Sequence, residues 1–204
     1  MKTFILLAAA ALIILILGVT YNTLVGKSQA VDSQWAQVQN VYQRRADLVP
    51  NLVATVSGAA NFEKSTLVAV TQARASVGQT KVDLSKPPAS AEALAAFQKT
   101  QDGLSSALSR LLVVSESYPD LKATTNFRDL QAQLEGTENR ITVERQSFNT
   151  VVQSYNTTVR AFPGVVLAGL FGFAPKPFFS AQAGSEVAPK VDFTTGTASG
   201  ASTH

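Results

Sequence analysis

The N-terminal part of the chain has no charged residue from Thr3 to Gly26. Within it, Phe4–Val19 reads FILLAAAALIILILGV and has no strongly polar side chain. Because a helix rises about 1.5 Å per residue, roughly 20 apolar residues cross the hydrocarbon core of a bilayer. We therefore predict that residues 1–26 are a membrane anchor that contacts the lipid bilayer through residues 4–21, with Tyr21 at the interface.

A cleaved signal peptide is the alternative interpretation of this apolar run. Lys2 supplies the positive residue that precedes a signal sequence, and Ser28-Gln29-Ala30 is an acceptable cleavage site. The run is slightly longer than the usual signal core of about 7–15 residues, and the site lies far beyond its end, so we favour an uncleaved anchor. Lys2 and Lys27 flank the run and specify its orientation only weakly. The slight bias places the N-terminus in the cytoplasm and the body outside it.

Apolar residues recur every three or four positions after the anchor. From Val31 to Ala59 their spacing alternates between 4 and 3, which is the repeat of helices packed along a seam. Arg45 is the one seam position that is not apolar. Pro50 lies in the same segment. Because proline removes a helical hydrogen bond and clashes with the preceding turn, we expect a kink or a break near Asp47.

The helical pattern continues over Phe62–Ala75, and a Gly- and Pro-containing loop over residues 78–90 separates it from two further helices. No convincing strand pattern is present, so the sequence predicts an all-α fold. The expected architecture is an N-terminal single transmembrane helix followed by an antiparallel bundle of three long helices over residues 27–162, or four if Pro50 or Gly58 splits the first. The expected limits of the later helices are Ser90, as an N-cap, to Tyr118, and Lys122 or Asn126 to Arg160.

Several separated strings carry a family resemblance. They are YNTLVG at 21–26, RRADLVPNLV at 44–53, YPDLKATTNFRDLQAQLEGTENRI at 118–141, FNTVVQSYNTTV at 148–159, FP at 162–163, GF at 172–173 and FF at 178–179. In this order and spacing the chain resembles the LemA family of bacterial membrane-anchored proteins over roughly residues 15–180. The resemblance implies a short N-terminal tail, one membrane span, a soluble helical bundle and no established enzymatic activity.

The main candidate site lies at the expected kink and comprises Arg44, Arg45, Asp47, Pro50 and Asn51. Arg45 falls on the apolar seam, where an unpaired charge is costly, so a carboxylate from another helix is expected beside it. Three interpretations stay open: a kink held by an arginine–carboxylate pair, a binding site for an anionic group, and catalysis, for which no nucleophile, metal set or base lies nearby in sequence. The candidate carboxylates are Glu138, Glu144 and Glu116.

A second candidate is the segment 163–180, which is apolar and broken by glycine and proline and therefore too short to span a bilayer. It packs across the end of the bundle, or it is an interfacial or partner-binding element. Residues 181–204 are rich in Ala, Gly, Ser and Thr and are expected to form a disordered tail. The candidate interaction residues of the apolar segment are Phe162, Pro163, Phe171, Phe173, Phe178 and Phe179.

Two smaller patterns have open interpretations. An aromatic-Asn-x-x-Val string occurs at Tyr21, at Phe148 and, one heptad after Phe148, at Tyr155. Its asparagines, Asn22, Asn149 and Asn156, lie at the solvent edge beside core aromatics, or they form a hydrogen-bonded ladder that fixes helix register. Residues 118–127 are dense in turn-forming and aromatic residues, which indicates a turn between helices or a docking surface for a partner.

Composition excludes several classes of protein. The chain has no cysteine, and its single histidine is His204, which excludes zinc-finger, iron–sulfur and disulfide-scaffold proteins and Cys- or His-based catalysis. The carboxylates lack a repeated metal-ligand spacing, glycine-rich nucleotide motifs are absent, and the basic residues are mostly single and interleaved with acids. We therefore expect no metal, no cofactor and no nucleic acid.

The sequence predicts a non-enzymatic, membrane-anchored helical scaffold or protein-interaction module of the bacterial envelope. It would act with a protein partner or as a homo-oligomer, as a single-pass protein of the inner (cytoplasmic) membrane with its soluble domain on the periplasmic or extracellular side. The alternative is an envelope sensory or signalling module that binds an anionic ligand near the Arg44–Asn51 kink.

Overall fold

The structure, a computed structural model, describes residues 1–59, 61–79 and 86–180. Within these ranges it contains helices and no strand, so the all-α prediction is confirmed. The expected tail at 181–204 and part of the expected loop at 78–90 lie outside the described residues. The helices are α1 (Lys2–Ser57), α2 (Lys64–Gly78), α3 (Ala91–Ser115), α4 (Pro119–Ala123), α5 (Thr125–Arg160) and α6 (Gly164–Phe171).

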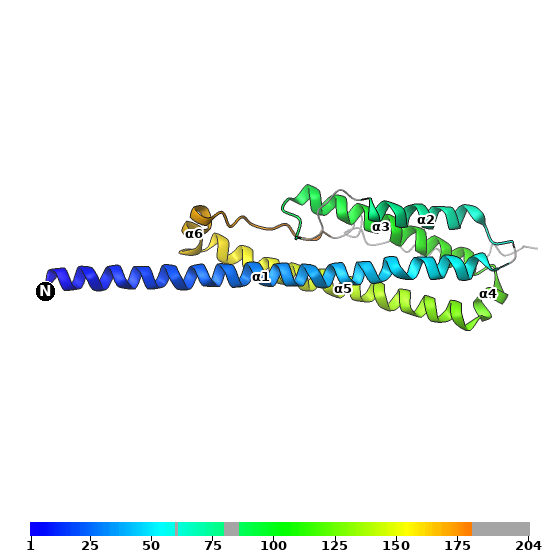
Figure 1. Ribbon diagram of the computed structural model, residues 1–204, viewed down its shortest axis with the longest axis horizontal. Coiled ribbons are helices and arrows are strands. Elements are labelled where there is room, and N and C mark those ends of the chain that lie inside the picture. Colours follow the sequence, from blue (N-terminus) through cyan, green and yellow to red (C-terminus); the bar gives the residue numbers. More distant parts are fainter. Residues whose placement is uncertain (60, 80–85, 181–204) are drawn as a thin grey trace, which may run out of the picture.

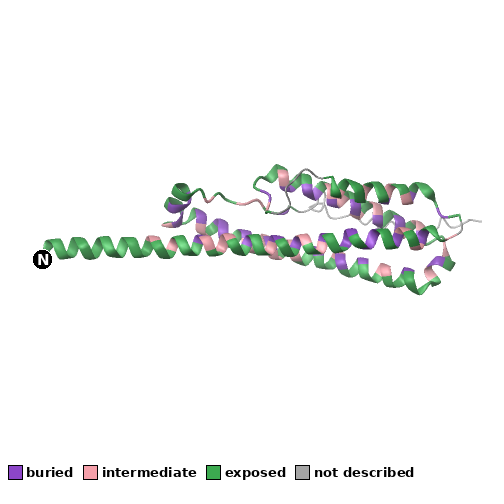
Figure 2. Ribbon diagram, in the orientation of Figure 1, coloured by how far each residue is buried: buried purple, intermediate pink, exposed green. Residues whose placement is uncertain are grey.

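The longest element is α1, which forms both the candidate membrane span and one side of the bundle (Figure 1). It is the one helix within the described ranges that is long and apolar enough to cross a bilayer. The side chains from Phe4 to Ile16 are exposed, and the first buried side chain is that of Leu24. Figure 2 shows this N-terminal part of α1 projecting beyond the packed helices.

Pro50 does not break α1, which continues to Ser57 as one rod (Figure 1). The alternative in which Pro50 splits the first helix is therefore wrong. A proline at position 50 has no N–H for the carbonyl of Ala46, four residues earlier. Arg74 on α2 supplies the missing donor, with its Nε 3.1 Å from the Ala46 oxygen. Gly58 instead marks the end of α1, so the bundle has four main helices.

The helices alternate in direction between two ends of the molecule. The proximal end is the level of Tyr21, and the distal end is the level of Gly58 and α4. As Figure 1 shows, α5 runs back along α1 from the distal to the proximal end, while α2 and α3 pack together on one side. The oxygens of Ser90 and Thr124 cap α3 and α5 by accepting from backbone N–H groups three residues on, so the expected Ser90 cap is confirmed.

Two apolar cores lie on either side of a polar layer. The proximal core is aromatic: the Trp35 ring lies 5.3 Å from that of Phe97 and 5.6 Å from that of Phe148, measured between centroids. The distal core is mostly aliphatic and includes Leu52 and Leu111. Along all three long helices, the residue between the two cores is polar; these residues are Arg45 on α1, Gln101 on α3 and Glu138 on α5.

Candidate functional site

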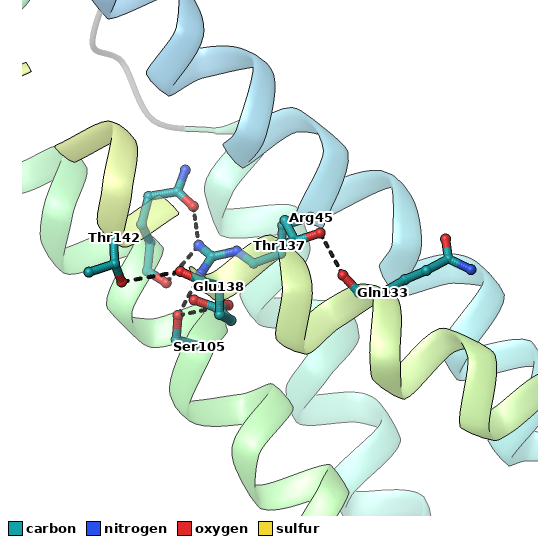
Figure 3. Close-up of polar contacts among 7 residues, drawn as sticks. Arg45, Ser105, Gln133, Thr137, Glu138 and Thr142 are labelled. Carbon is teal, nitrogen blue, oxygen red and sulfur yellow. Dashed lines mark hydrogen bonds and ion pairs between the residues drawn. The ribbon is translucent and has the colours of Figure 1, made fainter. Parts of the chain in front are cut away.

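Arg45 is the centre of the polar layer and is almost fully buried, with 1% of its surface exposed. Its Nη1 donates to Glu138 Oε1 at 2.8 Å and to the Ser105 hydroxyl. Its Nη2 donates to the backbone and side-chain oxygens of Gln101, and its guanidinium lies 5.1 Å from the centroid of the Tyr42 ring. One side chain thereby joins α1, α3 and α5 (Figure 3).

The expected carboxylate partner of Arg45 is present, and it is Glu138. The other two candidates bind elsewhere: Glu144 accepts from Gln34, and Glu116 pairs with Lys122. The Glu138 side chain is 41% exposed, so the pair is buried on its cationic side and partly hydrated on its anionic side. This arrangement leaves both terminal nitrogens of Arg45 engaged.

The other members of the predicted constellation do not join Arg45. Arg44, Asp47, Pro50 and Asn51 are all exposed. Asp47 Oδ1 accepts from Gln43 at 2.8 Å on the same helix. Positions 44, 47 and 51 share a helical face by their spacing, and that face differs from the face of the seam. The structure therefore separates the constellation into one buried cation and an exposed polar stripe.

Burial also changes the chemistry of the tyrosine beside Arg45. Desolvation raises the pKa of the Tyr42 hydroxyl, and the positive charges of Arg145 and Arg45 oppose that rise in part. Within the described ranges, no group of three His, Asp or Glu side chains could hold a metal ion. The polar layer thus provides a buried, hydrogen-bonded connection between three helices.

The second site is a clamp on the C-terminal extended segment, residues 173–180. Asn156 donates from Nδ2 to the carbonyl of Lys176 and accepts from the Lys176 N–H, both at 2.8 Å. Asn149 does the same with Phe179, at 2.9 and 2.8 Å. The two asparagines therefore bind the backbone of another segment, which differs from both interpretations that the sequence left open.

The spacing of this clamp follows from helix and strand geometry. Seven residues along a helix rise about 10 Å, and three residues of extended chain cover the same distance. Two asparagines one heptad apart can therefore each reach a backbone unit three residues apart. Prolines at 175 and 177 favour the extended conformation that this match requires.

Side-chain contacts hold the same segment on the bundle. The Phe179 ring is buried against Trp35 and Phe148, with centroids 6.1 and 5.3 Å away. Lys176 Nζ forms an ion pair with Asp32 at 2.8 Å. The carbonyl of Ser180 accepts from both Gln98 and Arg145, and that of Ala174 accepts from the Tyr155 hydroxyl. The segment is thus part of the bundle surface along its whole length.

The predicted interaction segment therefore divides into two parts with different surroundings. Phe179 is buried, and Phe173 is partly buried against the proximal core. Phe162 and Phe171 are exposed at the proximal end, as is Phe178 on the outside of the clamped segment, and Pro163 is partly covered. Chain direction explains the split, because α6 lies at the proximal end and the segment after it turns back along the bundle (Figure 1).

The distal end carries an open pocket of about 660 Å³. It is formed where α1 ends and α4 begins. Several of its lining residues belong to residues 118–127, the region that the sequence indicates as a turn or a docking surface. Tyr118 fixes one side of this turn, because its hydroxyl donates to the carbonyl of Asn61 at 2.9 Å. The pocket is lined by Thr55, Gly58, Ala59, Ser117, Tyr118, Pro119, Asp120, Leu121, Thr124 and Asn126.

The fold and these sites define a membrane-associated all-α protein with one candidate span, a clamped helical bundle and a distal pocket. The model of the LemA family matches residues 34–193. The chain belongs to the LemA family.

Three relatives illustrate how far the similarity extends. Two magnetosome proteins, MamQ 1 and MamQ 2 of Paramagnetospirillum magneticum, are each 25% identical over 174 residues, which cover 78% of this chain and 64% of the relative. Protein LemA of Metamycoplasma hominis is 24% identical over 156 residues, 73% of this chain and 67% of that protein. The chain therefore spans about 64% of the length of the magnetosome proteins.

Proposed function

We propose that this protein is a non-enzymatic, membrane-anchored scaffold or protein-interaction module of the bacterial envelope. The observation that carries the proposal is the continuity of α1, because one helix forms both the candidate span and a full side of the bundle. From Leu24 to Ser57 this helix rises about 50 Å. A span connected without a linker holds the distal end at a set height from the membrane.

The contacts inside the bundle favour a rigid scaffold over a sensor whose shape changes when a ligand binds. Arg45 connects three helices at mid-height, and the clamp by Asn149 and Asn156 closes the proximal half. The alternative, a sensor for an anionic ligand at Arg45, has less support because Glu138, Gln101 and Ser105 already bind its terminal nitrogens. An incoming anion would have to displace a carboxylate from a buried guanidinium.

We place the partner contact at the distal pocket, for two reasons. The pocket lies at the end of the bundle farthest from the span, and its lining combines apolar surface with the exposed polar residues Asp120 and Asn126. Such mixed lining is typical of protein-binding surfaces. The partner is a second copy of this chain or another envelope protein, and the soluble domain lies on the periplasmic or extracellular side.

Photo-cross-linking of the full chain in its membrane tests the interaction. A photoreactive residue at Asn126, in the pocket, is compared with one at Gln72, which is exposed on α2 and is not part of the pocket lining. We expect adducts of discrete mass from position 126 and none from position 72, and an assembly in mild detergent that is heavier than one chain. A strictly monomeric particle with no adduct at either position would refute the scaffold proposal.

A reporter fused after His204 tests the orientation separately. We expect a reporter that works only outside the cytoplasm to be active there. Activity of a cytoplasm-only reporter at the same position would overturn the proposed side of the membrane without affecting the scaffold proposal.

A further inference from the structure

The outward face of α6 is apolar, although the helix lies at the surface of the molecule. Its exposed positions follow helical spacing, and the opposite face, which includes Leu167 and Ala168, is buried against the bundle. A helix that is apolar on all sides is typical of a membrane or of a deep core. The exposed face consists of Val165, Val166, Gly169 and Leu170, and Phe162 extends it before the helix begins.

This face is at the level of the C-terminal end of the candidate span. The Tyr21 ring on α1 lies 4.9 Å from that of Phe171 and 6.0 Å from that of Phe173. From Phe4 to Tyr21 the helix rises only about 26 Å, which is less than the roughly 30 Å of a hydrocarbon core. A hydrocarbon core that begins near Phe4 therefore ends close to Tyr21, within about one helical turn of it, so α6 lies at the level of the edge of that core.

Charged residues mark a common boundary for the two apolar segments. Residues 3–26 and 161–175 carry no charge. Lys27, the first charged residue after the span, donates to Thr158 Oγ1 at 2.7 Å, two residues before Arg160 at the end of α5. The uncharged part of α1 thus ends at the level where the uncharged region after α5 starts, and a membrane surface would lie at this common level.

The chain on both sides of α6 is fixed. Before it, α5 is packed along α1 and bound to Lys27. After it, the extended segment is clamped, beginning with the bond from the Tyr155 hydroxyl to the Ala174 carbonyl and the paired bonds between Asn156 and Lys176. The exposed apolar face is therefore held beside the span.

We propose that α6 is inserted in the same bilayer as α1, with its Val165, Val166 and Leu170 face among the acyl chains of the leaflet from which the bundle emerges. The inference rests on the proposed membrane anchor. The continuity of this face with the exposed surface of the span favours lipid over a protein partner. Phe162 is 84% exposed and Leu170 is 74% exposed, so both present large apolar surfaces to the surrounding medium.

Single-cysteine labelling can test this directly, because the chain has no cysteine of its own. We suggest a nitroxide label at Leu170→Cys in the full chain, reconstituted in vesicles of phosphatidylethanolamine and phosphatidylglycerol. Two controls have nearly the same exposure as Leu170 at 74%: Ile14→Cys in the span, at 70%, and Val113→Cys on α3, at 70%. The measurement is collision of the label with oxygen, which concentrates in lipid, and with a water-soluble nickel chelate.

We expect L170C to have an oxygen-to-nickel accessibility ratio several-fold above that of V113C and below that of I14C, which lies deeper in the bilayer, with Val166→Cys behaving like L170C. A ratio at L170C equal to that of V113C, with I14C in lipid, would overturn this inference and leave the anchor intact. Low accessibility to both reagents at L170C would also overturn it, since a protein would then cover α6. A water-like ratio at I14C would overturn both the anchor and the inference.

Discussion

Arg74 donates to the carbonyl of Ala46, which is the group that Pro50 deprives of its helical donor. A contact between α2 and α1 thereby compensates for a proline in the middle of a continuous helix. The compensation is specific, because the donor is needed only while residue 50 lacks an N–H.

The first prediction follows from this dependence. Arg74→Ala should lower the free energy of unfolding by about 1 kcal/mol, the usual cost of leaving a partly buried carbonyl without a donor. In a Pro50→Ala background the same substitution should cost clearly less, because an alanine at position 50 restores the helical hydrogen bond. Denaturant unfolding of the four proteins of this cycle, followed by circular dichroism in detergent, measures the coupling. Equal costs in the two backgrounds would show that Arg74 acts by another route.

The second prediction concerns the unequal exposure of the two partners in the polar layer. Glu138→Ala leaves a buried guanidinium without its carboxylate and should cost about 3 kcal/mol. Arg45→Met should cost less, because methionine fills the apolar seam and the orphaned Glu138, at 41% exposed, can bind water. The free energies of unfolding of the two single variants and of the double variant show which substitution costs more. A larger cost for Arg45→Met would show that the lost contacts to buried Gln101 and to Ser105 outweigh the hydration of Glu138.

The third prediction addresses the clamp at single-residue resolution. In the structure the N–H groups of Lys176 and Phe179 donate to Asn156 and Asn149. Asn156→Ala should therefore accelerate hydrogen exchange at the amide of residue 176, with a smaller effect at 179, while the far-ultraviolet circular dichroism stays unchanged. The matched control is Asn139→Ala, an exposed asparagine on the same helix. Exchange at residue 176 that is the same in both variants would refute the clamp.

The fourth prediction uses the only tryptophan, Trp35, as a reporter of the same segment. Phe179 is buried against this ring, whereas its neighbour Phe178 is 47% exposed. Phe179→Ala should shift the tryptophan emission to longer wavelength and lower the free energy of unfolding by about 3 kcal/mol. Phe178→Ala should do neither to a comparable extent. Equal spectra for the two variants would mean that Phe179 does not cover Trp35 in solution.

The fifth prediction concerns alkaline pH. Burial raises the pKa of Tyr42 above its ordinary value near 10, so the folded state holds this proton more tightly than the unfolded state. The resulting stability is present below about pH 10 and is lost as the pH rises through the folded-state pKa. Tyr42→Phe should therefore make stability fall less steeply above about pH 10. The free energy of unfolding, measured at a series of fixed pH values for both proteins, tests this. An unchanged fall in the variant would show that another group causes it.

Local signals made much of the fold predictable from sequence. The uncharged run to Gly26 predicts the span, the 3.5-residue repeat predicts the seam, and Ser90 predicts a cap. The burial of Arg45 also required a carboxylate, although sequence could not choose Glu138 from three candidates. That choice depends on which turn of α5 lies at the level of residue 45, and this is fixed only when the helices are packed.

The features that were missed all depend on tertiary placement. From sequence alone Pro50 predicts a helix break, because the compensating hydrogen bond from Arg74 to the Ala46 carbonyl depends on how α2 packs on α1. The heptad spacing of Asn149 and Asn156 is visible in the sequence, but their partners are backbone atoms, which have no sequence signature. The prolines at 175 and 177 were the available clue, since they predict an extended segment of matching length.

Because α1 is unbroken, it connects the candidate membrane span rigidly to the distal pocket. With about 50 Å of helix above the membrane, a change of about 10° in the tilt of the span displaces the distal pocket by roughly 9 Å. The tilt of a span changes with the thickness of the surrounding bilayer, so in the proposed arrangement membrane thickness would set the position of the proposed partner-binding pocket. If α6 rests in the same leaflet, it supplies a second point of support and sets the resting angle.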